Sequence, residues 1–131
     1  MMNEVQIQIE SDNRIFPVGI DLEDSWILGW SYYKEELQIE IELSIWPESP
    51  YYEEPLNGNY TCYKLGQLIF HDVKTIKGFF ELENIEPTID PDGSKDWGNI
   101  YGLSKTKTGV KFLAEDIEVD IETSGLSIKI N

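Results

Sequence analysis

Carboxylates far outnumber every other group in this chain that is capable of chemistry. The 131 residues hold 25 Asp and Glu, 10 Lys and Arg, one His and one Cys. A Ser-His-Asp or Cys-His arrangement would have to use His71, which lies on a predicted strand with no nucleophile motif beside it. Cys62 is expected to be a small buried apolar residue, and a single Cys with a single His excludes the usual zinc site. We therefore predict a protein without catalytic residues, enzymatic activity or a cofactor.

Residues 90–96, with the sequence DPDGSKD, form the strongest local motif for a metal. Oxygen ligands at alternating positions around a Gly turn suit calcium, and Asp90, Asp92 and Asp96 match the register of EF-hand-like loops, which this segment resembles. Thr88 and Asn99 stand where that pattern has its first Asp and its bidentate Glu. The other interpretation is a Pro-Asp-Gly turn whose carboxylates cap backbone amides, and we expect folding to be independent of metal.

Residues 47–59 form the longest break between predicted strands. Three prolines make this segment stiff and irregular, and loops of this length in a compact domain are often functional. Tyr51 and Tyr52 stand beside Glu53 and Glu54, so that the segment offers aromatic anchors flanked by carboxylates. Such a loop can hold a basic protein surface or stack a sugar ring, or its tyrosines can fold back over the end of the β structure.

Residues 37–46 have the clearest structural pattern in the chain. Apolar residues occupy every odd position from 37 to 45, which predicts a central strand with one buried face. Acidic residues fill the other face there, and the same arrangement returns at residues 117–122. We predict that these acidic faces and the aromatic loop contact a partner, through Glu40, Glu42, Tyr51, Tyr52, Glu53, Glu54, Glu118, Asp120 and Glu122.

Period-two alternation recurs along most of the chain, and no amphipathic helix is evident. Residues 21–25 and the neighbourhood of Gly66 are expected to be turns, and Gly29 is expected to mark a bulge or a close backbone approach. The last third is expected to be a meander. The predicted fold is an all-β, antiparallel, single domain over residues 1–131, either a β-sandwich or a closed β-barrel of about ten short strands. The strands are expected at residues 5–10, 16–20, 26–33, 37–46, 60–64, 67–71, 74–83, 97–104, 110–114, 117–122 and 126–130.

The charge balance limits the partners. A net charge of −15 and a pI near 4.2 exclude general nucleic-acid binding and disfavour anionic membranes. The N-terminal sequence has no signal-peptide pattern, no apolar run reaches the length of a membrane span, and one cysteine cannot form an intramolecular disulfide. We therefore expect a cytoplasmic protein. Its charge either keeps it soluble or steers it to a basic partner.

In general character the chain resembles the small acidic immunity proteins of bacterial toxin systems, a resemblance that rests on no motif and assigns no residue. It implies a non-enzymatic protein that neutralises a basic toxin domain by binding it. Two alternatives remain open. One is a β-barrel that binds a small ligand or carbohydrate through Trp26, Trp30, Tyr51 and Tyr52, and the other is a weak calcium-binding module. The oligomeric state is not predicted.

Overall fold

The computed structural model describes residues 3–55, 61–78, 88–89, 95–96, 98–114 and 117–131. Within these residues the chain forms strands and no helix, which confirms the all-β prediction. The same residues form thirteen strands, and all of the pairings among them are antiparallel. A search of the described residues for a helix long and apolar enough to cross a membrane finds none.

The larger sheet has five strands. Its spatial order is β1 (Asn3–Glu4), β13 (Gly125–Ile130), β6 (Cys62–His71), β5 (Glu36–Ile45) and β4 (Ile20–Tyr33). β5 pairs with a strand on each side, and its apolar residues from Leu37 to Ile45 are all buried. Glu40 and Glu42 lie on the opposite face and are half-buried. The predicted register of this strand is therefore confirmed.

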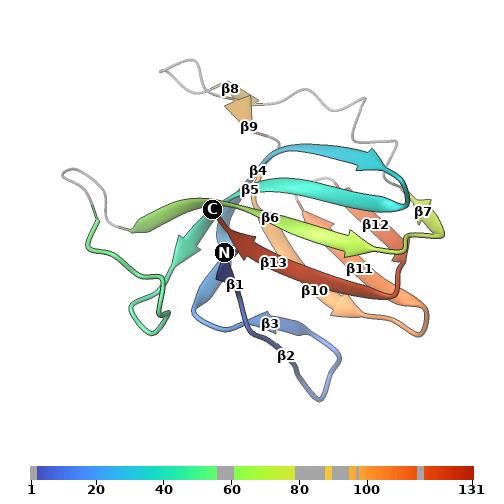
Figure 1. The fold of residues 1–131 in the computed structure, drawn as a ribbon, viewed down its shortest axis with the longest axis horizontal. Helices are drawn as coiled ribbons and strands as arrows, with labels where there is room; N and C mark the ends of the chain where they lie inside the picture. Colours follow the sequence, from blue (N-terminus) through green and yellow to red (C-terminus); the bar gives the residue numbers. More distant parts are fainter. Residues whose placement is uncertain (1–2, 56–60, 79–87, 90–94, 97, 115–116) are drawn as a thin grey trace.

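The second sheet has four strands and lies behind the first in Figure 1. Two short hairpins complete the described structure. The order of the second sheet is β10 (Ile100–Lys105), β11 (Gly109–Ala114), β12 (Ile117–Glu122) and β7 (Thr75–Lys77), and the hairpins are β2 (Ile7–Ile9) with β3 (Ile15–Pro17) and β8 (Thr88–Ile89) with β9 (Lys95–Asp96). The meander expected in the last third covers only β10 to β12, because β13 crosses to the five-stranded sheet and pairs with β6.

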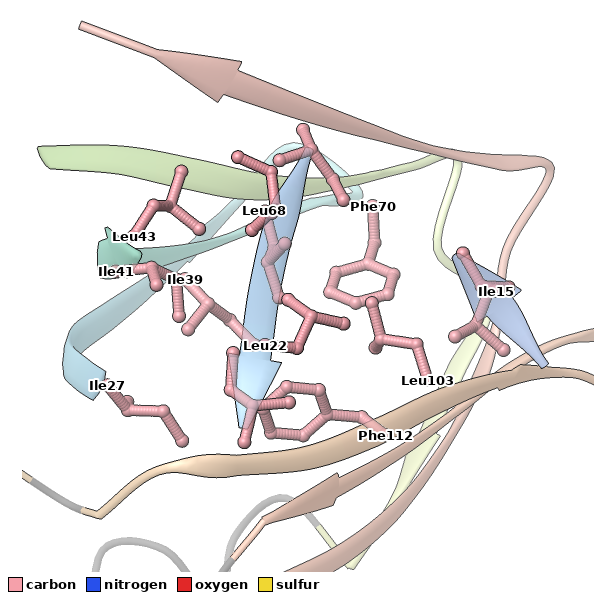
Figure 2. Close-up of a cluster of buried hydrophobic side chains, with 14 of the residues drawn as sticks. Ile15, Leu22, Ile27, Ile39, Ile41, Leu43, Leu68, Phe70, Leu103 and Phe112 are labelled. Atoms are coloured by element: carbon pink, nitrogen blue, oxygen red, sulfur yellow. The ribbon is translucent and has the colours of Figure 1, made fainter. Parts of the chain in front are cut away.

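The two larger sheets contribute to one hydrophobic core. Figure 2 shows Ile39 and Phe70 of the five-stranded sheet lying close to Leu103 and Phe112 of the four-stranded sheet. The sheets approach each other through β4 and β10. Just before β10, Asn99 forms a bridge with Trp26, and the carbonyl of Gly98 accepts the backbone N–H of Ile27 at 2.9 Å. No closed barrel is found among the described residues.

The turn expected at residues 21–25 is wrong, because this segment lies inside β4. The pairing of β4 with β5 shifts between Asp21 and Trp26, so the polar run forms an irregularity within a continuous strand. A second shift between Ile27 and Gly29 confirms the predicted bulge. It also moves Trp30 onto the core side, although strict alternation would put Trp30 on the face opposite Ile27.

Two further expectations are corrected. β6 runs without a break through Gly66, because this glycine admits the carbonyl oxygen of Lys129 into the space that a side chain would fill. The strands expected at residues 5–10 and 16–20 correspond in part to β2 and β3, which pair as a hairpin. Ile15 and Pro17 are the buried residues of β3, and Ile20 already belongs to β4.

Candidate functional site

The structure separates the predicted acidic faces. Glu40 and Glu42 lie on the outer face of the five-stranded sheet, whereas Glu118, Asp120 and Glu122 lie on β12 of the other sheet and alternate with its buried residues. The acidic residues of β12 also have cationic neighbours. Lys111 forms an ion pair with Glu118 at 3.2 Å and lies opposite Asp120 in the ladder. These residues therefore do not form one continuous acidic surface.

The predicted aromatic loop is described as far as residue 55, and its tyrosines pack inward. Tyr51 and Tyr52 are half-buried against the core, and the Tyr51 hydroxyl donates to the carbonyl of Glu4 at 3.2 Å. Burial, followed by the charge of Glu54, raises the pKa of Tyr52. Glu53 is exposed and pairs with Lys64 at 3.4 Å. The tyrosines thus act mainly as packing residues in this conformation.

Of the predicted metal ligands, Asp90 and Asp92 lie outside the described residues. Asp96 is in β9, and the Asn99 amide, in the position of the missing Glu, donates to the carbonyl of Glu23 at 2.8 Å. Among the residues that the structure describes, no group of three or more His, Cys, Asp or Glu is placed to hold a metal ion.

The remaining candidates for chemistry are His71, Cys62 and Tyr63. His71 is half-buried at the end of β6, with its Nε2 atom 2.9 Å from the Ser127 hydroxyl, and Cys62 is buried and free. On the outer face of the same sheet the Tyr63 hydroxyl donates to Asp24 at 2.8 Å. Partial burial and this bond to a carboxylate raise the pKa of Tyr63.

A cleft of about 520 Å³ brings together residues that the sequence does not associate. It lies where the β2–β3 hairpin, the beginning of β4, the end of β5 and the strand β10 meet. We call it the acidic-aromatic cleft. Its lining is Glu10, Arg14, Ile15, Phe16, Pro17, Ile20, Asp21, Leu22, Glu23, Trp46, Tyr101, Gly102 and Leu103.

Backbone contacts hold the walls of the cleft in place. The Trp46 N–H donates to the carbonyl of Gly19 at 2.8 Å, which holds the backbone of Trp46 beside the start of β4. Gly19 has a φ of 76°, and a Cβ atom there would lie 2.7 Å from the Cβ of Ser49, so glycine is required at this close approach. On the opposite side, the Lys105 N–H donates to the carbonyl of Asn13 at 2.7 Å and holds the hairpin against β10.

The cleft has an excess of negative charge. Its cation, Arg14, is held by Asp12, which accepts from the Arg14 backbone N–H at 3.1 Å and from Nε at 2.9 Å. The backbone hydrogen bond, followed by the guanidinium charge, lowers the pKa of Asp12, which therefore stays ionised. Asp21 accepts from the Glu23 N–H at 3.1 Å, and Glu10 and Glu23 are exposed. With Arg14 already paired, the three lining carboxylates leave the cleft suited to a cation.

Three aromatic rings accompany these carboxylates. Trp46 is 39% exposed, Tyr101 is 55% exposed, and Phe16 is half-buried. Aromatic faces next to carboxylates attract Lys and Arg side chains by cation–π and charge interactions. One feature of the sequence could have pointed to this site, namely the position of Trp46 after a strand whose odd residues are buried. Comparison of the chain with known protein families, with characterised proteins and with solved structures gives no match.

Proposed function

We propose that the protein is a non-enzymatic binding protein that recognises a basic protein surface, and that the acidic-aromatic cleft receives a Lys or Arg side chain of that partner. The observation that carries this proposal is the convergence of Glu10, Asp21 and Glu23 with Trp46 and Tyr101 in one cleft. Exposed aromatic residues supply contact area at interfaces, and surrounding carboxylates select a cationic partner. The net charge of −15 favours the same class of partner by steering its approach.

The neutralisation of a toxin domain in the manner of an immunity protein is the biological role that fits this proposal best. It needs a stable acidic binding surface and no catalytic group. Two sheets that share one core and meet through β4 and β10 support a two-layered sandwich as the scaffold.

The test begins with capture of the partner from the source cell, followed by binding kinetics with the purified partner across a salt series. Glu10→Gln/Glu23→Gln removes two charges from the cleft, and Glu118→Gln/Asp120→Asn removes two charges from β12. Because the change in net charge is the same, a difference between the two variants reports position. We expect the cleft variant to slow association by several-fold at low salt and the β12 variant to change it little.

A second pair of variants tests the aromatic anchor. Tyr101→Ala should speed dissociation by about tenfold, because removal of a ring that packs against the partner weakens the formed complex more than it hinders encounter. Tyr33→Ala, at a strand tyrosine that is 72% exposed and does not line the cleft, is the matched control. An acidic partner surface, an association rate that is flat with salt, or equal effects of the two charge variants would each contradict the proposal.

Carbohydrate binding is a second candidate, favoured by the two exposed rings beside the carboxylates. The volume of about 520 Å³ is within the usual range for small-ligand sites. A carbohydrate would stack on Trp46 and Tyr101 and not on the predicted Tyr51 and Tyr52, which pack against the core. Glycan-array binding that is abolished in Tyr101→Ala and retained in Tyr33→Ala would favour this function over recognition of a protein.

A further inference from the structure

A second concavity, separate from the acidic-aromatic cleft except for the shared residue Ile15, lies at the end of the molecule where two turns meet the N-terminal hairpin. Its volume is about 380 Å³. The β2–β3 hairpin forms one wall, and residues 105–109 and 123–125, which connect β10 to β11 and β12 to β13, form the others. We call it the lysine-rimmed pocket.

The interior of the lysine-rimmed pocket is apolar. Ile15 and Val110 are buried at its base, and Ile7 and Leu126 pack against the core while remaining partly exposed. Ile9 is 52% exposed, which is a large solvent-facing fraction for an isoleucine on a short strand. A hydrocarbon chain that covers these side chains would gain free energy from the apolar area removed from water.

The charge of this pocket is the reverse of the charge of the protein as a whole. Lys105 and Lys107 line it, and none of the described residues that line it is Asp or Glu, in a chain with 25 acidic residues. Within the described part of the chain neither lysine forms an ion pair, although Arg14, Lys64, Lys74 and Lys111 each pair with a carboxylate. Glu122, next to the wall, accepts a hydrogen bond from Thr75 and is not part of the lining.

Hydroxyl groups on the two turns hold the polar rim in shape. Thr106 Oγ1 accepts the Gly109 N–H at 3.1 Å, which closes the turn that carries the lysines. On the other turn Thr123 donates to the backbone carbonyl of His71. Two lysines on a hydrogen-bonded turn thus line the same concavity as the apolar residues of its base.

We propose that the lysine-rimmed pocket binds a small amphipathic anion, namely a hydrocarbon chain of medium length that ends in a carboxylate. The chain lies on Ile7, Ile9 and Leu126, and the carboxylate accepts hydrogen bonds from the Lys105 and Lys107 ammonium groups. Both parts are required, because exposed lysines alone hold a simple anion weakly and an apolar surface alone does not distinguish a charged chain from a neutral one.

Calorimetric titration of the intact protein tests this proposal with three probes. Decanoate carries both features, decanol carries the chain alone, and acetate carries the charge alone, and each is kept below the concentration at which it self-associates. We expect decanoate to bind at one site, decanol to bind about tenfold more weakly and acetate to give no measurable binding.

Two sets of variants place the binding in this pocket. Lys105→Gln/Lys107→Gln should reduce decanoate affinity to that of decanol, whereas Lys34→Gln/Lys77→Gln, which removes two exposed lysines elsewhere, should not. Ile9→Glu adds a carboxylate at an exposed position, so it should abolish decanoate binding by like-charge repulsion without unfolding the protein. Ile9→Gln, of nearly the same size, should retain most of the affinity, and circular dichroism checks the fold of each variant.

Equal affinity for decanoate and decanol would overturn the proposal, as would acetate binding at the strength of decanoate. Wild-type affinity in Lys105→Gln/Lys107→Gln would place any binding elsewhere and overturn it too. Sedimentation of the protein with vesicles of anionic lipid, with no binding of free decanoate, would assign the pocket to membrane contact and reject a free ligand.

Discussion

At the scale of single residues, Gly66 has a role that is specific to its lack of a side chain. It lies within β6, between β5 and β13, where a Cβ atom would overlap the carbonyl oxygen of Lys129 and lie 2.6 Å from Cδ1 of Leu43. The carbonyl oxygen belongs to the backbone of a paired strand and cannot move without disturbing the ladder. Gly29 on β4 differs, because nothing lies within 4 Å of its Cβ position.

We predict that Gly66→Ala lowers the free energy of unfolding by about 3 kcal/mol, because the added methyl group overpacks a close backbone approach. Gly29→Ala, the matched change at an open strand position, should alter it by less than about 0.5 kcal/mol. Urea denaturation measures both values. Equal stabilities for the two variants would show that β13 can shift to admit the methyl group.

Tyr63 links stability to pH. Its pKa in the folded protein lies above the ordinary value of 10.0, chiefly through burial and then through the bond to Asp24. The folded state therefore retains the phenolic proton better than the unfolded state does. This stabilisation is present below the unfolded pKa and is lost as pH rises through the folded pKa.

We predict that the wild-type protein loses more stability than Tyr63→Phe between about pH 8 and about pH 11, because phenylalanine has no proton to lose. Urea denaturation at both pH values gives the two differences, and tyrosines common to both proteins cancel in the comparison. Tyr32→Phe, at an exposed tyrosine near the opposite end of the same sheet, should follow the wild type. Parallel losses in wild type and Tyr63→Phe would remove Tyr63 as the cause.

At the scale of elements, the polar irregularity in β4 depends on Ser25. This side chain is buried, donates to the carbonyl of Asp21 at 2.6 Å and accepts the backbone N–H of Ser44 at 3.1 Å. The hydroxyl thus replaces ladder hydrogen bonds that the shifted register of β4 and β5 does not make. The irregularity is therefore satisfied by hydrogen bonds, although its sequence is typical of a turn.

Ser25→Ala should lower the free energy of unfolding by about 2 kcal/mol, because the Ser44 N–H is left buried without its acceptor. Ser31→Ala, at an exposed position on the same strand, serves as the control and should be nearly neutral. Both values come from urea denaturation. A Ser25→Ala protein as stable as the control would mean that the irregularity in β4 adapts by changing register.

Prediction from the sequence succeeded where the pattern was local. The alternation at residues 37–45 and 110–114 indicated the strands and their buried faces. A strand with one apolar and one polar face can bury its apolar residues in only one orientation, so the pattern determines which residues face the core. It failed at residues 21–25 and at Gly66, because polar runs and glycines have turn propensity that tertiary contacts override here. The placement of β13 was missed because pairing with β6 joins segments more than 50 residues apart.

At the scale of the whole molecule, the candidate site could not be derived from local patterns. The acidic-aromatic cleft takes its lining from four separate regions of the chain, between Glu10 and Leu103, and only the folded backbone brings them together. The predicted acidic residues, in contrast, were inferred from strand alternation and are distributed over two sheets. Overall charge could be deduced from composition, and its spatial distribution could not.

The excess of carboxylates should also make global stability depend on salt. Repulsion among like charges opposes the compact state, and added ions screen it. We predict that raising NaCl from about 0.05 M to about 0.5 M increases the melting temperature by about 3–6 °C. Glu48→Lys/Glu54→Lys, at two exposed sites, should reduce this increase because it lowers the magnitude of the negative net charge. A melting temperature that falls or stays constant with salt would contradict the prediction.

The pairing of β1 with β13 has a consequence for how the chain is made. Asn3 lies opposite Ile130, so β1 and β13 lie side by side in the larger sheet, as Figure 1 shows. During synthesis β6 lacks one of its two neighbouring strands until residues 125–130 have left the ribosome. The larger sheet is therefore complete only after nearly all of this sequence has been synthesised. A short linker between β13 and β1, with new ends opened at the exposed turn of Lys34 and Glu35, would give a permuted gene in which β4, and no longer β13, is the last strand to be synthesised.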